Sequence, residues 1–207
     1  MSDGHDHAHH QAPGSRRARS EFELRTMALE AALGEAGRTS TDAVDAFVEH
    51  LEHRMGPHHG ARVVARAWVD PAFKERLLAD GTAAVAELGI AGAEGDNVRV
   101  VENTERVHNL VVCTLCSCYP WPLLGVPPTW YKSFGYRSRA VAEPRRVLDE
   151  FGCRLADDVE IRVWDSSAAI RYLVLPQRPA GTEAMTEEEL AALVTRDAMI
   201  GVRLATV

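Results

Sequence analysis

The sequence predicts an α+β protein in which an N-terminal helical arm precedes a mixed domain. Apolar residues recur with helical spacing in the first half of the chain, whereas short β-branched runs separated by turns follow residue 97. With 207 residues, 46% of them hydrophobic, the chain is long enough to bury a core in one domain plus an extension. We therefore expect three parts: a tail at 1–20, a helical arm at 21–92 and an α+β domain at 93–207.

The tail is rich in histidine and arginine. These residues are His5, His7, His9 and His10, then Arg16, Arg17 and Arg19. A histidine-rich tract is able to bind divalent metal, but such a terminus is also typical of a flexible, solubilising end. We expect a flexible tail, and both roles remain open.

The arm carries two helical patterns. Apolar residues with i, i+3, i+4 spacing, following Asp42 in the first turn, are Val44, Phe47, Val48, Leu51 and Met55. A second helical block runs over 61–88 and is interrupted at Asp70-Pro71 and Asp80-Gly81. Because an isolated arm has little to pack against, we expect a partner chain to cover it.

The remaining elements alternate between strands and helices. Strands are predicted at 98–101, 110–112, 159–164 and 172–175. A helix is predicted to begin at Pro144 and to end before Gly152. Thr186 and Glu189 form a capping-box pattern ahead of a last helix.

Charge and hydropathy exclude several classes of function. The net charge is −7 without a long basic stripe, which disfavours nucleic-acid binding. No apolar run approaches the roughly 20 residues of a membrane helix, and the N-terminus lacks an apolar signal region. We expect a cytoplasmic protein without a membrane or nucleic-acid partner.

Three of the four cysteines lie in one hexapeptide, Cys113-Thr114-Leu115-Cys116-Ser117-Cys118, which we call the cysteine loop. A disulfide within it would be strained or would leave one thiol unpaired, and a redox Cys-x-x-Cys site does not need the third thiol. A structural zinc site needs a fourth ligand, and neither His108 nor Cys153 has the customary spacing. The pattern favours a transition metal other than zinc.

The short spacing of the last two cysteines also indicates the kind of metal. If the sulfurs of Cys116 and Cys118 bind one ion, the intervening main-chain amides are carried to the same ion. Deprotonating an amide nitrogen requires a strong Lewis acid, which argues for trivalent cobalt or iron.

The chain resembles the α-subunit of nitrile hydratase over residues 40–203. The resemblance begins in the cysteine loop and Trp121-Pro122. It continues through GVPPTWYKS at 125–133, YRSR at 136–139, EPRRVL at 143–148, EIRVWD at 160–165 and YLVLPQRPAGT at 172–182. Several long strings in the same order make the resemblance specific.

The resemblance implies the ligand set and the metal. The ligands would be the sulfurs of Cys113, Cys116 and Cys118 and the amide nitrogens of Ser117 and Cys118, with the sixth position open to water or nitrile. Cys116 would be oxidised to the sulfinic and Cys118 to the sulfenic acid. Thr114, where iron-type members carry serine, points to one cobalt(III) ion per chain rather than iron(III).

The resemblance also implies an architecture and partners. The expected fold is a layered α-β-β-α catalytic domain, which makes residues 93–207 the metal-binding catalytic domain. The expected partner is a β-subunit, in an αβ heterodimer or an α2β2 assembly, whose arginines contact the oxidised sulfurs. A cobalt-loading accessory protein is expected as well.

The expected reaction is hydration of a small nitrile to its amide, the work of a hydro-lyase. A metal is able to polarise the nitrile or lower the pKa of water. We expect Cys118 to be catalytic, because a sulfenate oxygen is a nucleophile or base beside the bound nitrile. Trp121 would line the substrate pocket, although a tryptophan between two prolines also suits packing.

Structural or surface roles are expected for the other residues near the cysteine loop in sequence. Aromatic side chains such as Trp130 and Tyr131 usually pack in the core. Three arginines, Arg137, Arg139 and Arg145, are expected on a solvated face, or paired with carboxylates of a partner. His108 is expected to be a structural histidine.

Two further functions remain open. The metal-bearing subunit of thiocyanate hydrolase carries a similar loop and acts on a different small substrate. A non-enzymatic metal-binding protein would use the cysteine loop together with the histidine-rich tail. Neither the preferred nitrile nor the oxidation state of Cys116 and Cys118 follows from the sequence.

Overall fold

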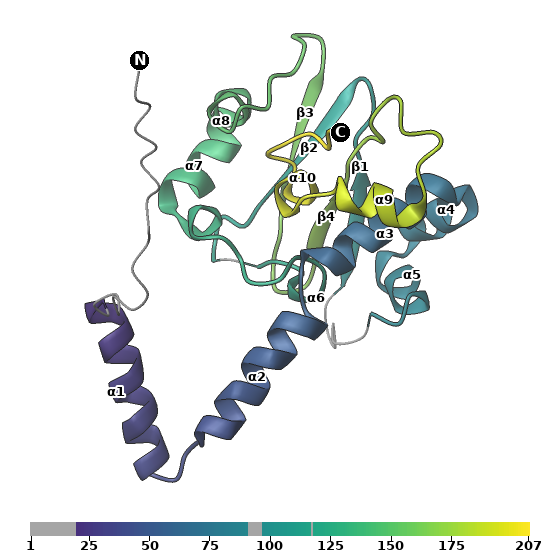
Figure 1. Ribbon diagram of the computed structural model, residues 1–207. Coiled ribbons are helices and arrows are strands. Elements are labelled where there is room, and N and C mark those ends of the chain that lie inside the picture. The colour runs from purple at the N-terminus through teal and green to yellow at the C-terminus, as the bar shows by residue number, and fades with distance from the viewer. Residues whose placement is uncertain (1–19, 91–96, 117) are drawn as a thin grey trace, which may run out of the picture. The chain divides into compact units, whose positions relative to one another are not determined.

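A computed structural model describes residues 20–90, 97–116 and 118–207 (Figure 1). The predicted tail therefore lies almost entirely outside the described residues, as does Ser117. The chain divides into two compact units, residues 1–48 and 49–207. The predicted division into tail, arm and catalytic domain remains a prediction.

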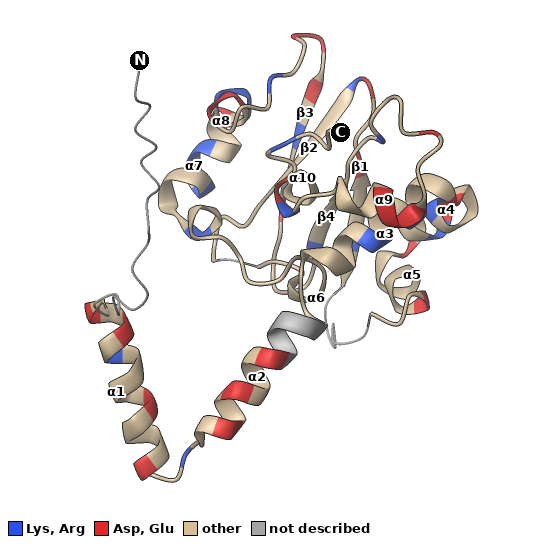
Figure 2. Ribbon diagram, in the orientation of Figure 1, with Lys and Arg blue, Asp and Glu red and all other residues tan. Residues whose placement is uncertain are grey.

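The first unit contains α1 (Glu21–Glu35) and the beginning of α2 (Thr41–Arg54). A capping box starts α1: the Glu23 amide donates to the Ser20 hydroxyl, and the Ser20 amide donates to the Glu23 carboxylate. No residue of α1 is buried, and Phe22 is 81% exposed. Acidic residues recur along α1 and α2 (Figure 2).

The second unit is α+β, which confirms the predicted fold class. Its helices and strands, in chain order, are α3 (Pro57–Val69), α4 (Pro71–Ala79), α5 (Gly81–Glu87), β1 (Val98–Glu102), β2 (Val107–Val112), α6 (Trp121–Leu124), the 3-10 helix η1 (Thr129–Lys132), α7 (Phe134–Ala142), α8 (Pro144–Glu150), β3 (Glu160–Asp165), β4 (Arg171–Leu175), α9 (Glu187–Ala192) and α10 (Arg196–Ile200). None of the described helices combines the length and apolarity that crossing a bilayer requires.

The helix starts have local causes that the sequence analysis identified. Asp70 and Asp80 each accept a hydrogen bond from the main chain at the start of α4 and α5, and Pro71 occupies the first turn of α4. The predicted capping box at Thr186 and Glu189 is present at the start of α9.

The strands form two parallel pairs. β1 lies beside β4, with Val98 opposite Arg171, and β2 lies beside β3, with Val107 opposite Glu160. The second pair ends with Val112 opposite Asp165. Consequently the cysteine loop, which follows β2, begins beside the end of β3.

The core packs helices against these strands. Its large, fully buried side chains include Phe73 and Leu77 of α4, Leu110 of β2 and Leu173 of β4. Figure 1 shows α9 beside α3, in agreement with their contacts. This packing fixes β2, the strand that leads into the cysteine loop.

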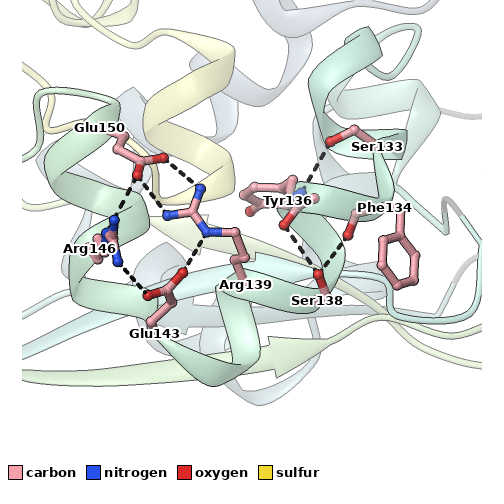
Figure 3. A network of polar contacts seen from close by, with 9 residues as sticks. Ser133, Phe134, Tyr136, Ser138, Arg139, Glu143, Arg146 and Glu150 are labelled. Carbon is pink, nitrogen blue, oxygen red and sulfur yellow. Dashed lines mark hydrogen bonds and ion pairs between the residues drawn. The ribbon is translucent and has the colours of Figure 1, made fainter.

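A ring of four charges joins α7 to α8 (Figure 3). The Arg139 guanidinium contacts Glu143 at 2.5 Å and Glu150 at 2.6 Å, and Arg146 contacts both carboxylates at 3.4 and 3.9 Å. These bonds raise the pKa of Arg139 and lower the pKa of both carboxyl groups. Arg139 is thus paired within the chain.

Candidate metal centre

The sulfurs of the cysteine loop converge. Cys113 and Cys116 Sγ are 3.4 Å apart, and Cys116 and Cys118 Sγ are 3.2 Å apart. All three sulfurs lie within 4.8 Å of one another, and among the described residues they form the one cluster of this kind. No disulfide joins them. The predicted sulfur ligands are therefore brought together, whereas Ser117 lies outside the described residues.

The sulfur spacings distinguish between coordination geometries. With metal–sulfur bonds of about 2.3 Å, neighbouring sulfurs of a tetrahedral site lie about 3.8 Å apart, whereas cis sulfurs of an octahedral site lie about 3.3 Å apart. The observed 3.4 and 3.2 Å match the octahedral value. For these two pairs the spacing favours a six-coordinate transition ion, and three thiols alone lack the fourth ligand of structural zinc.

The loop passes from the core to the surface. Cys113 is buried, Cys118 is half-buried and Cys116 is exposed. Burial, together with the hydrogen bond to Cys116 and the nearby thiols, raises the pKa of the Cys118 thiol to about 12. Without a metal the protein thus disfavours a thiolate at Cys118, and a bound cation would reverse that preference.

Asp165, at the end of β3, holds the start of the loop. Its two carboxylate oxygens accept hydrogen bonds from the Thr114 amide at 2.9 Å and the Thr114 hydroxyl at 2.5 Å. The sequence analysis missed Asp165. Its position after a strand was visible, but only the parallel pairing of β2 with β3 places it beside the cysteine loop.

Main-chain carbonyls of the loop accept hydrogen bonds from η1 and α7. The Tyr131 hydroxyl donates to the Cys118 carbonyl at 3.0 Å. One Arg137 nitrogen donates to the Thr114 and Cys116 carbonyls, each at 3.4 Å. Sequence reasoning assigned Tyr131 to the core, which is correct, and placed Arg137 on a solvated face, which missed its contacts with the loop.

Trp121, the predicted pocket residue, begins α6 three residues after Cys118. Its side chain is 41% exposed, so it is available to a substrate or a partner chain. The exposed side chain of Leu115 belongs to the loop itself. The substrate-binding role of Trp121 remains a prediction.

His108 has the structural role that was expected. It is buried, its Nε2 lies 2.7 Å from the Gly201 carbonyl and its Nδ1 lies 3.3 Å from the Asn103 amide nitrogen. The carbonyl requires Nε2 to carry the proton, so Nδ1 accepts. Both ring nitrogens are therefore used, and the burial of the ring lowers the pKa of His108.

Comparison with known proteins agrees with this geometry. Residues 20–203 match the family model for the nitrile hydratase alpha chain. The chain is 58% identical to the low-molecular weight cobalt-containing nitrile hydratase subunit alpha of Rhodococcus rhodochrous, over 96% of this chain and 97% of that protein. It is 43% identical to the thiocyanate hydrolase subunit gamma of Thiobacillus thioparus, over 88% of this chain and 79% of that protein.

A solved structure shares the fold. The Fe-type nitrile hydratase of Comamonas testosteroni Ni1, solved as a double mutant, superposes with a TM-score of 0.82 at 42% identity, covering 89% of this chain and 90% of that chain. The match over nearly the whole chain and the converging cysteines lead to one conclusion. This chain belongs to the nitrile hydratase alpha-chain family.

Proposed function

We propose that this chain is the α-subunit of a cobalt-dependent nitrile hydratase, a hydro-lyase that converts a nitrile to the corresponding amide. The observation that carries this proposal is the convergence of three sulfurs, at spacings suited to a six-coordinate ion, in a chain 58% identical to a cobalt-containing relative. Bound cobalt(III) supplies a Lewis acid that activates the nitrile or water toward hydration.

The residues of this chain have separate tasks in the proposal. Cys113, Cys116 and Cys118 supply sulfur ligands, and the amides of Ser117 and Cys118 supply nitrogen. Cys118, oxidised to the sulfenic acid, would present an oxygen that either attacks the nitrile carbon as a nucleophile or takes a proton from the attacking water as a base. Trp121, partly exposed beside the loop, forms one wall of the substrate pocket.

As an alpha chain, this protein implies a β-subunit partner. We infer that the two form an αβ heterodimer or an α2β2 assembly, and that an accessory protein loads cobalt. Because uncontrolled oxidation would destroy a loop of three free thiols, assembly in the reducing cytoplasm is the consistent location.

The test is to co-express the chain with its β-subunit and to combine elemental analysis with the intact mass of the peptide spanning Cys113 to Cys118. One cobalt per chain, two added oxygens on Cys116, one on Cys118 and amide production from a simple nitrile are expected. Carbonyl sulfide from thiocyanate would instead assign thiocyanate hydrolase activity. Stoichiometric zinc, or fully reduced thiols in an active enzyme, would refute the proposal.

A further inference from the structure

The segment from η1 to α7 contacts the main chain of the cysteine loop at three positions and the main chain of β2 at a fourth. Its donors are the hydroxyls of Tyr131 and Tyr136 and the guanidinium of Arg137. Their acceptors are the main-chain carbonyls of Val111, Thr114, Cys116 and Cys118. Because these acceptors run from the end of β2 to the last cysteine, the loop is held along its length rather than at a single point.

The two tyrosines anchor the two ends of the loop. The Tyr136 hydroxyl donates to the Val111 carbonyl at 2.6 Å, two residues before Cys113, and the Tyr131 hydroxyl donates to the Cys118 carbonyl at 3.0 Å. Both rings are buried, with centroids 5.8 Å apart. The separation of the loop ends is therefore set by side chains in mutual contact.

The aromatic side chains around these tyrosines restrict their movement. The Trp130 ring packs edge-to-face on Tyr136 at 4.9 Å and on Phe151 at 4.7 Å, and Tyr119 packs on Tyr131 at 5.2 Å. Such contacts stabilise a single ring orientation. Because each ring is held in this way, its hydroxyl has a fixed position. That position determines where the main-chain carbonyl bound to it lies.

Arg137 holds the middle of the loop. Thr114 and Cys116 lie outside the described helices and strands. One guanidinium nitrogen bridges their carbonyls. Ordering a loop residue costs conformational entropy, and these contacts let folding meet that cost before a metal binds.

We propose that Tyr131 and Arg137 are positioning residues that preorganise the cysteine loop for its metal. Their hydrogen bonds go to main-chain carbonyls of the loop, and they act by fixing these carbonyls, on which the sulfur positions depend. The inference rests on the proposed function, because it assumes that the three sulfurs bind cobalt. It adds that the strength of binding depends on a segment outside the loop.

The chain offers matched controls for both substitutions. Tyr119 is also buried and donates its hydroxyl to a carbonyl, that of Leu124, outside the loop. Arg145 also donates to main-chain carbonyls, those of Ala156 and Val159, in the segment before β3. Tyr119→Phe removes a hydroxyl that bonds outside the cysteine loop and keeps the ring that packs on Tyr131, and Arg145→Ala removes hydrogen bonds to main-chain carbonyls outside the loop.

The experiment titrates the full-length, reduced chain with Co²⁺ under anaerobic conditions and follows the thiolate-to-cobalt charge-transfer band. Loss of one hydrogen bond in Tyr131→Phe, and of the two long ones that share a nitrogen in Arg137→Ala, predicts about three- to tenfold weaker binding for each variant. The two controls should stay within about twofold of the original chain. Thermal melting of each variant reports any loss of folding.

Each outcome bears on one proposal. Unchanged cobalt affinity in both Tyr131→Phe and Arg137→Ala, or equal weakening in the controls, overturns the positioning role while the proposed function stands. If the unsubstituted chain shows no charge-transfer band, the cobalt content per chain after co-expression with the β-subunit replaces the titration, and absence of cobalt there contradicts the proposed function instead. If Tyr131→Phe does not fold, Arg137→Ala, at a side chain that is only half-buried, decides the question.

Discussion

Thr114 and Asp165 are joined by two hydrogen bonds although 51 residues separate them in the sequence. The amide and the hydroxyl of Thr114 donate to different oxygens of the same carboxylate. β2 and β3 end side by side, which places Asp165 opposite the residue that precedes Cys113. The β2–β3 pair therefore positions the first residues of the cysteine loop.

Replacing Asp165 with Asn should loosen this attachment. An Asn side chain has one carbonyl oxygen and is unable to accept from both donors of Thr114 in the same geometry. Because both hydrogen bonds are exposed, we expect a stability loss of only about 1 kcal/mol but a clear fall in bound cobalt per chain. Elemental analysis measures the metal, and Asp158→Asn, at an exposed position in the segment before β3, serves as the control. Full metal content in Asp165→Asn would show that this attachment is dispensable.

Replacing Cys113 with Ser should abolish metal retention. Cys113 is the buried member of the sulfur cluster, and a serine hydroxyl is a poor ligand for a metal that selects thiolates. Cys153→Ser, at a second buried free cysteine, controls for the loss of a buried thiol. A Cys113→Ser chain that keeps both cobalt and turnover would contradict the ligand assignment.

Local signals made part of the fold predictable. The breaks at Asp70-Pro71 and Asp80-Gly81 separate α3, α4 and α5 in the structure, because an aspartate that caps a helix acts through its nearest neighbours. By contrast α7, which the sequence analysis did not predict, buries only Tyr136 and Ala140. Two buried residues give too weak a periodicity to recognise.

The sequence predicted the three sulfur ligands of the candidate site but not the residues that hold the cysteine loop in place. The three cysteines lie within six residues, so their spacing alone indicated a shared metal ion. Asp165 and Arg137 approach the loop only through strand pairing and helix packing. Such contacts depend on which distant elements meet, and the pattern of a single strand or helix does not encode the identity of its partner.

His108 should make the stability of the chain sensitive to acid. Burial among uncharged partners lowers its pKa below the reference value of 6.5, so the unfolded chain binds the proton more readily. The resulting stabilisation is present above pH 6.5 and is lost as the pH falls toward the folded-state pKa. We expect His108→Gln to be less stable at neutral pH, by about 1–3 kcal/mol, and to lose less stability on acidification. Urea unfolding at several pH values measures both effects, and parallel pH profiles for the two chains would contradict this role.

The charge ring of Figure 3 should contribute modestly and in a salt-dependent way. Arg139 contacts two carboxylates, but its side chain is 36% exposed. We expect Arg139→Ala to lower the melting temperature at low salt and to lower it distinctly less at about 1 M salt, where exposed charges are screened. Arg162→Ala, which breaks a pair with Glu160 inside a single strand, should lower it less. Thermal melting at two salt concentrations measures the difference, and a loss independent of salt would assign Arg139 a packing role instead.

Gly201 should tolerate no side chain. It ends α10 with φ of +92°, and a Cβ there would lie 2.0 Å from the Asn109 carbonyl oxygen. That oxygen belongs to the main chain of β2 and is unable to move without displacing the strand that leads to the cysteine loop. We therefore expect Gly201→Ala to destabilise the chain by well over about 2 kcal/mol or to prevent folding.

Gly152 separates the two causes of this effect. It follows α8 with φ of +79°, yet a Cβ there would meet nothing within 4 Å. Gly152→Ala should therefore cost only the left-handed backbone strain, about 1–2 kcal/mol. Urea unfolding of both variants measures the difference, which isolates the collision with β2. Equal losses in the two variants would mean that backbone conformation alone requires glycine at 201, and that α10 and β2 have room to separate.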